Sequence, residues 1–154
     1  MKTIHRTIVS GLVFSKDGKL LMGQKDPQSG GVYADCWHIP GGGVDDGETK
    51  EQALRREMEE EVGINTERCA VILAADDQGT GESVKVLKDT GEKVLCKMQF
   101  NVYRIDVPEN ADDITLTPSD DLVTLEWVKL EDLAHYKLTP PSQALFKRLG
   151  YLSL

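Results

Sequence analysis

Two hydrophobic periods alternate along this chain, one typical of strands and the other typical of helices. The strand period is clearest over residues 94–107 (VLCKMQFNVYRIDV), where every second residue from Cys96 to Arg104 belongs to a mostly apolar set that is expected to face a core. Residues 4–14 are rich in β-branched side chains and lead into Ser-Lys-Asp-Gly, a sequence typical of a hairpin turn. Strands are predicted over residues 4–14, 19–24, 37–39, 69–75, 94–107 and 122–128, and the apolar strand 69–75 is expected to be buried.

The helical period governs the stretch that follows Gly47. Leu54, Met58 and Val62 recur at positions i, i+4 and i+8, and therefore form one apolar stripe. Gly63 comes directly after this stripe, as expected of a glycine that ends a helix. Two shorter helices are predicted near the C-terminal end, over residues 130–135 and 141–149, the second one capped by Gly150.

Polar segments separate these elements. Residues 26–35 form a Gly/Pro/Ser loop, residues 76–92 are polar and glycine-rich with a Thr-Gly turn, and residues 108–120 form an acidic loop. Lys25, at the entry to the first loop, is expected to be solvated, with a phosphate contact as the alternative. Strands on both sides of a central helix, with another helix at the end, predict an α+β sandwich in a single domain spanning residues 1–154.

Three glutamates lie on one edge of the predicted central helix. At 3.6 residues per turn, Glu60 lies about 60° to one side of Glu57 and Glu61 about 40° to the other. Three like charges are costly to hold together unless a cation joins them, and clustered carboxylate oxygens are ligands that Mg²⁺ or Mn²⁺ prefers. The helix therefore predicts half of a divalent-metal site. Glu59 points away from this edge and is expected to be solvated.

The glycines before the helix point to the same chemistry. Gly41, Gly42 and Gly43 follow Pro40, and glycines can adopt backbone angles that are closed to other residues. Such a segment could approach a phosphate closely or offer a carbonyl oxygen to a metal. An ordinary solvated acidic helix is the alternative interpretation, but it leaves these glycines unexplained.

The spacing of these residues resembles the Nudix box. The pattern is a glycine, a glutamate six residues later, an Arg-Glu pair, a Glu-Glu pair and a final glycine, with apolar residues at fixed places. It is filled without a departure by Gly42, Glu48, Arg56, Glu57, Met58, Glu60, Glu61, Gly63 and Ile64.

The resemblance implies a fold, a reaction and a set of roles. The implied fold is the Nudix α/β/α sandwich around a mixed sheet, and the implied reaction is hydrolysis of a phosphoanhydride bond with Mg²⁺, or Mn²⁺ as a substitute. The implied metal ligands are Glu57, Glu60 and Glu61, with the Gly41 carbonyl in addition. One of these carboxylates, or an acid from another loop, serves as the general base.

The remaining members of the box are expected to support the catalytic set. Arg56 lies on the flank of the acidic edge, where its planar fork can hold Glu48 or Glu60 in place. The predicted catalytic residues are therefore Glu57, Glu60, Arg56 and Glu48.

Many relatives supply one more acid from the loop before the last strand. The candidates here are Asp120 and Asp121, with Asp121 preferred as a metal ligand, and Glu126 is the third choice. A solvated loop acid is the alternative for each aspartate.

Substrate identity lies outside the box. The Gly-Val-Tyr segment before Trp37, the long strand after a Thr-Gly turn, and Trp127-Val128 followed by residues 131–136 are similar to a bacterial nucleoside triphosphatase subgroup of the family. That similarity implies release of pyrophosphate and a nucleoside monophosphate from a nucleoside triphosphate. Two alternatives stay open: hydrolysis of another nucleoside diphosphate derivative (ADP-ribose, a dinucleotide polyphosphate or a nucleotide sugar), and a non-catalytic nucleotide-binding regulatory module.

Charge and composition restrict the kinds of partner that the protein is expected to bind. A formal net charge of −8 argues against a nucleic-acid polymer, whereas a small nucleotide can bind where metals neutralise the site. The three cysteines are expected to be free thiols, and no apolar run reaches the length of a signal or membrane segment, so a cytoplasmic location without membrane association is expected. A homodimer is common among relatives, but no feature of this sequence requires one.

Overall fold

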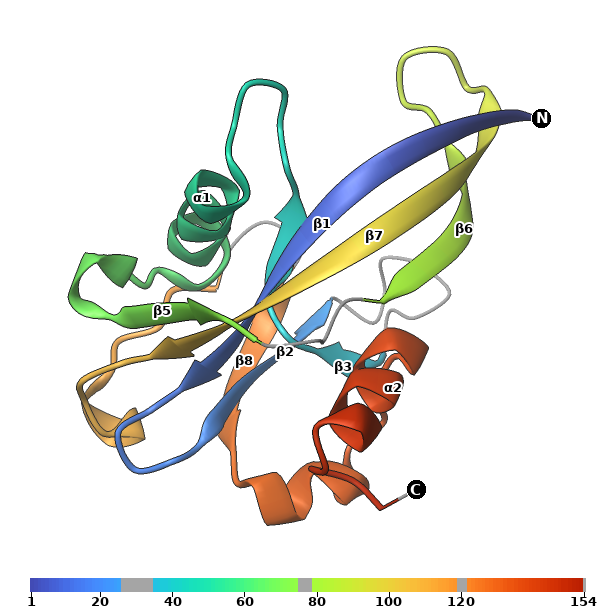
Figure 1. Ribbon diagram of the computed structural model, residues 1–154. Coiled ribbons are helices and arrows are strands. Elements are labelled where there is room, and N and C mark those ends of the chain that lie inside the picture. The colour runs from blue at the N-terminus through green and yellow to red at the C-terminus, as the bar shows by residue number, and fades with distance from the viewer. Residues whose placement is uncertain (26–34, 75–78, 119–121, 154) are drawn as a thin grey trace.

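The computed structural model describes residues 1–25, 35–74, 79–118 and 122–153. Its helices and strands closely match the predicted order (Figure 1). The strands are β1 (Lys2–Phe14), β2 (Leu20–Lys25), β3 (Trp37–His38), β4 (Gly41–Gly43), β5 (Ala70–Leu73), β6 (Thr80–Val86), β7 (Lys93–Asp106) and β8 (Leu122–Val128). The α-helices are α1 (Lys50–Val62) and α2 (Pro140–Arg148), and short 3₁₀ helices cover Thr66–Arg68, Ala111–Asp113 and Leu130–His135.

The strands of the described chain form one mixed sheet organised around β1 and β7. These two long strands are parallel, and their register runs from Lys2 opposite Val94 to Phe14 opposite Asp106. On its other edge, β7 pairs antiparallel with β5 and β6, while β1 pairs antiparallel with β4 and, through Phe14, with β2. The remaining strands β3 and β8 both pair with β2. The sheet is mixed, as predicted.

A helix covers each face of this sheet. Helix α1 packs its fully buried stripe, Leu54, Met58 and Val62, into a core with strands β1 and β7. On the other face, Leu145 and Phe146 of α2 pack into a second core. Figure 1 shows the two helices on opposite sides of the strands, which gives the α/β/α sandwich that was predicted. Within the described residues, no helix is both long enough and apolar enough to span a bilayer.

Gly11 lets α1 come close to the sheet. A methyl group on this residue of β1 would lie 3.2 Å from the Met58 sulfur and 3.0 Å from a terminal carbon of Ile105. Because a real side chain would crowd both, the glycine sets the distance at which α1 packs on β1. This contact places the acidic edge of α1 beside β4.

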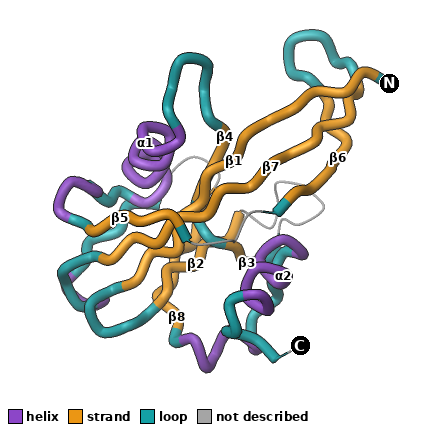
Figure 2. The backbone as a smooth tube through the Cα atoms, in the orientation of Figure 1, coloured by secondary structure: helices purple, strands orange, loops and turns teal. Residues whose placement is uncertain are grey.

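Two expectations about strands were wrong. Strand β5 is not buried, because Ile72 and Leu73 are 59% and 49% exposed. It pairs with β7 alone among the described strands, so it lies at an edge of the sheet. Residues 80–86, expected to be irregular, form strand β6, as Figure 2 shows. Their alternation is hard to detect because both faces of β6 are largely polar or exposed.

The core-facing set predicted for β7 is partly confirmed. Cys96 and Val102 are buried, whereas Arg104 is half-buried and lies over the ring of Phe14 at 4.3 Å. The alternate face of the strand also contains buried residues, among them Asn101. Both faces are covered in part because β7 runs between two layers.

Candidate functional site

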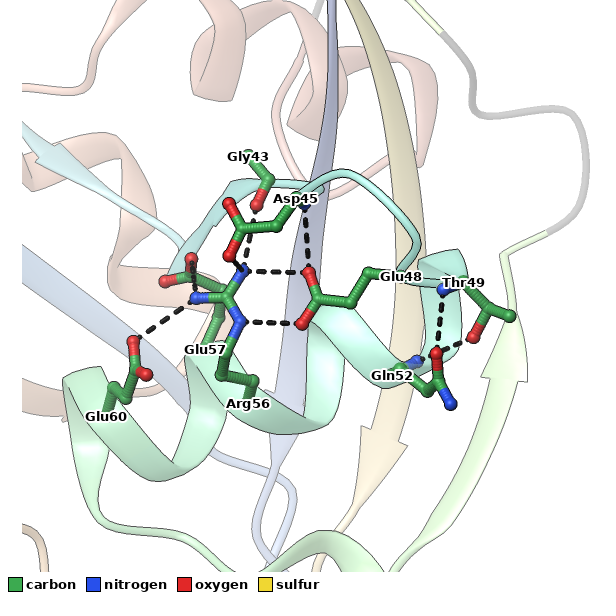
Figure 3. A network of polar contacts seen from close by, with 8 residues as sticks. All are labelled: Gly43, Asp45, Glu48, Thr49, Gln52, Arg56, Glu57 and Glu60. Carbon is green, nitrogen blue, oxygen red and sulfur yellow. Dashed lines mark hydrogen bonds and ion pairs between the residues drawn. The ribbon is translucent and has the colours of Figure 1, made fainter.

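Helix α1 has a capping box at its start and a glycine cap at its end. The Thr49 hydroxyl accepts a hydrogen bond from the Gln52 amide at 3.1 Å, and the Gln52 side-chain oxygen accepts one from the Thr49 amide at 2.9 Å. This capping box satisfies amides that a helix start leaves without partners (Figure 3). At the other end Gly63 has φ of +75°, a left-handed conformation that ends the helix as predicted. The helix register, and hence the acidic edge, is fixed at both ends.

Arg56 lies at the centre of a network of oxygen atoms (Figure 3). Its Nε donates to Glu48 at 2.7 Å, and its Nη2 donates to Glu48 at 3.1 Å and to the Gly43 carbonyl at 3.0 Å. Its Nη1 donates to Glu57 at 2.9 Å and to Glu60 at 3.2 Å. The guanidinium therefore joins the loop before α1 to two carboxylates on the helix.

Glu48 also organises the loop between β4 and α1. Its Oε1 accepts a hydrogen bond from the Asp45 amide at 3.0 Å, and the turn between them contains Gly47 with φ of +81°. The hydrogen bonds from Arg56 and from the Asp45 amide hold the pKa of Glu48 below its usual range. The same contact with Glu48 raises the pKa of Arg56 further above its already high value, so the guanidinium stays charged.

The three glycines of β4 make room for neighbouring side chains. None of them has a positive φ, so they do not use the left-handed conformation that is open to glycine. They form a strand opposite Ser10, Val9 and Ile8 of β1. What they provide is space, because a methyl group on Gly42 would lie 2.5 Å from Cδ of Glu57. The absence of a side chain lets the Glu57 carboxylate approach the main chain of β4.

A cleft of about 690 Å³ opens beside β4 and the acidic edge of α1. The predicted metal ligands of the described chain, Gly41, Glu57, Glu60 and Glu61, all line it. Glu57 is largely covered, Glu61 is buried and Glu60 is half exposed. The full lining consists of Arg6, Ile8, Lys25, His38, Gly41, Gly42, Gly43, Glu57, Glu60, Glu61 and Lys85.

The family model of the NUDIX domain matches residues 4–149. The chain belongs to the Nudix family. Proteins named nucleoside triphosphatase NudI from Escherichia coli, including strains ED1a and K12, are 32% identical to it over 150 residues, which cover 96% of this chain and 99% of theirs.

Solved structures support the Nudix fold. The E. coli dihydroneopterin triphosphate pyrophosphohydrolase has a TM-score of 0.69 at 18% identity, with 92% of each chain covered. The Nudix hydrolase RenU from M. smegmatis has a TM-score of 0.65 at 22% identity, covering 97% of this chain and 86% of that one. The predicted family and fold are confirmed, and the chain is a Nudix hydrolase.

The donor atoms of the Nudix helix fit a hard divalent cation. Among the described residues, no three acidic, histidine or cysteine side chains converge closely enough to enclose a metal. The excess of negative charge nevertheless favours a bound cation. Four carboxylates lie within 3.4 Å of Arg56, and its single positive charge offsets only one of them. Nη1 of Arg56 already joins Glu57 to Glu60, which shows that these two carboxylates can share one cation. Oxygen donors in a cluster whose carboxylates outnumber its arginine suit Mg²⁺ or Mn²⁺.

Of the three candidates for a further acidic metal ligand or base, the structure describes only Glu126. Asp120 and Asp121 lie outside the described residues. Glu126 on β8 is exposed and accepts a hydrogen bond from the Tyr136 hydroxyl at 2.8 Å. Burial and this carboxylate raise the pKa of Tyr136 to about 12. Glu126 is not among the residues that line the cleft.

Sequence reasoning missed two basic cleft residues, Arg6 and Lys85. Arg6 belongs to β1, where it interrupts an apolar run, and Lys85 belongs to the unpredicted strand β6. Lys25, for which a phosphate contact was the less favoured interpretation, lines the same cleft. The available signal was alternation in residues 80–86, which would have placed Lys85 on one face of a strand.

Proposed function

We propose that this Nudix hydrolase cleaves a nucleoside triphosphate into a nucleoside monophosphate and pyrophosphate, in a reaction that depends on Mg²⁺. The observation that carries the proposal is that Glu57, Glu60 and Glu61 line one cleft with the backbone of β4. The substrate class is supported by the relatives named nucleoside triphosphatase, which match nearly the whole chain.

The chain's own residues would hold the metal and accept a proton. A phosphoanhydride resists hydrolysis mainly because its negative charge repels a nucleophile, so the site must supply positive charge and position a water molecule. Mg²⁺, or Mn²⁺ in its place, supplies that charge when bound and lowers the pKa of a coordinated water. Glu57, Glu60, Glu61 and the Gly41 carbonyl would hold the metal. One of these carboxylates, or a further acid such as Asp121, would accept the proton from the attacking water.

Arg56 and Glu48 support this set as positioning residues. Arg56 fixes the carboxylates of Glu57 and Glu60 through Nη1, while its opposite edge is held by Glu48 and the Gly43 carbonyl. Because the guanidinium is anchored on the loop side, the two helix carboxylates keep a defined orientation. Because all three nitrogens of Arg56 already donate to protein oxygens, this arginine is poorly placed to bind a phosphate.

A nucleotide panel with Mg²⁺ tests the proposal, with pyrophosphate resolved from orthophosphate. The wild-type chain should release pyrophosphate from at least one nucleoside triphosphate, and chelation of the metal should abolish the activity. Cleavage of ADP-ribose, a dinucleotide polyphosphate or a nucleotide sugar in preference to every triphosphate would overturn the substrate class. Binding of nucleotide without cleavage of any of them would identify a regulatory module instead.

Glu60→Gln and Glu59→Gln form a matched pair for the metal site. Glu60 lines the cleft, whereas the adjacent Glu59 is exposed on another side of α1 and does not line it. Glu60→Gln should lower kcat by about 100-fold or more, since losing one charged metal ligand removes roughly 3 kcal/mol of transition-state stabilisation. Glu59→Gln should leave kcat within about twofold, because surface changes of this kind cost little. Equal rates for the two variants would contradict the assignment.

Asp121→Ala tests the additional acid. At saturating Mg²⁺ this variant should turn over about tenfold or more slowly, as expected when a general base or a metal ligand is lost. Wild-type rates from Asp121→Ala would remove Asp121 from the catalytic set and leave the helix carboxylates as the candidates for the base.

A further inference from the structure

The cleft contains three cations that the proposed metal site does not use. Arg6, Lys25 and Lys85 come from β1, β2 and β6, and together they form the cationic side of the cleft. Arg6 and Lys85 project from the same face of the sheet, because their partners on β7, Met98 and Val94, are an even number of residues apart. Two strands that are far apart in the sequence thus direct long basic side chains into one space.

These cations have no carboxylate partner in the described part of the chain. The ion pairs found there, with N–O distances up to 4.0 Å, include neither Arg6, Lys25 nor Lys85. Arg56, by contrast, contacts four carboxylates. Cationic groups that share a cleft with three glutamates but do not pair with them are available to an incoming anion.

Strand β4 explains why the charges stay separate. Gly42 makes room for Glu57, and a methyl group on the next residue, Gly43, would lie 3.0 Å from Cζ of Arg6. Successive strand residues face opposite sides, so the Glu57 carboxylate and the Arg6 guanidinium approach β4 from its two faces. A strand without side chains thus holds an anion and a cation close together and keeps them from neutralising each other.

We propose that Arg6, assisted by Lys85, binds the phosphate chain of the nucleotide across the cleft from the glutamates of α1. This inference rests on the proposed function, since it assigns a binding residue for that substrate. The planar guanidinium can donate two parallel hydrogen bonds to phosphate oxygens, whereas Lys85 contributes a single charge. The carboxylates on the other side attract the metal, so the phosphate chain lies between two positive groups.

Binding of a methylene-bridged, non-hydrolysable nucleoside triphosphate in Mg²⁺, measured by calorimetry, tests the inference. Arg6→Met retains most of the aliphatic stem and should raise Kd by about tenfold or more, the loss expected for hydrogen bonds between charged groups. Arg6→Lys should recover part of that loss, and Lys85→Met should raise Kd by roughly threefold, as for one exposed charge. Lys2→Met is the matched control, because Lys2 projects from the same face of β1 but does not line the cleft.

Turnover separates this inference from the proposed function. With a cleavable triphosphate, Arg6→Met should raise KM by about the factor seen in Kd and leave kcat within about threefold, since uniform binding is lost. If the wild-type chain cleaves triphosphates but Arg6→Met equals Lys2→Met in Kd and KM, the Arg6 assignment fails and the function stands. If the wild type binds the analogue and cleaves nothing, the function fails, while weaker binding by Arg6→Met would still support the assignment. A wild-type chain that does not bind the analogue overturns the assignment.

Discussion

At the scale of single residues, Arg56 organises the site more than any other described side chain. Its three nitrogens contact Glu48, Glu57, Glu60 and the Gly43 carbonyl, with Asp45 at 3.4 Å. The sequence placed Arg56 beside the acidic edge and gave it Glu48 or Glu60 as alternative partners. The structure shows both contacts at once, because the loop that contains Glu48 folds back over the helix.

The effect of Arg56 on Glu48 can be measured directly. In Arg56→Met, the pKa of Glu48 should rise toward its ordinary value of about 4.3, because its hydrogen bonds from the guanidinium are lost. A carboxyl-carbon NMR titration of the metal-free protein measures this shift. Arg55→Met is the matched control, since Arg55 contacts Glu51 and Thr66 instead.

The same shift predicts how stability depends on pH. Because the pKa of Glu48 is lowered by folding, its contribution to the free energy of unfolding is complete above about pH 4.3 and is lost as the pH falls through the folded-state value. The stability gap between the wild type and Arg56→Met should therefore narrow in acid. A gap that widens in acid, or an unchanged pKa of Glu48 in Arg56→Met, would contradict this description of the network.

At the scale of elements, helix α1 could be predicted almost completely and strand β6 not at all. A stripe of Leu54, Met58 and Val62 followed by Gly63 is a local pattern, and the structure confirms it residue by residue. Strand β6 depends on pairing with β7, a contact between segments, and its apolar alternation is limited to Val84 and Val86. Lys85 was missed as a cleft residue for this reason.

Strand β4 shows the same limit of prediction from sequence within the site. Its glycines were correctly associated with the cleft, but their role in admitting Glu57 and Arg6 depends on β1 and α1 approaching from either side. A sequence shows that three side chains are absent. It does not show which groups occupy the space that they leave.

Substitutions in β4 should separate packing from chemistry. A methyl group on Gly41 would lie 2.7 Å from Cα of Ser10, whereas one on Gly42 meets the movable end of Glu57. Gly41→Ala should therefore lower the unfolding free energy by about 1–3 kcal/mol, as overpacking against a backbone does. Gly42→Ala should change stability less but displace the Glu57 carboxylate and lower kcat by about tenfold or more. Thermal unfolding and turnover of both variants give the comparison, and a stable, fully active Gly42→Ala would contradict the role given to Glu57.

At the scale of the whole molecule, side chains of both charges meet in one cleft. The chain has a formal net charge of −8, yet the cleft beside β4 and α1 is lined by three glutamates and three basic residues from β1, β2 and β6. Composition alone indicated an acidic protein that needs cations near its substrate. The folded sheet adds that some of those cations are side chains of the protein itself.

The central claim is that the glutamates of α1 capture divalent cations for hydrolysis of a phosphoanhydride. Anomalous diffraction from crystals soaked in Mn²⁺ tests it most directly. The predicted result is manganese within about 2.5 Å of carboxylate oxygens of Glu57, Glu60 or Glu61, in the cleft beside Gly41. A cleft without manganese at a concentration that supports full turnover would contradict the claim.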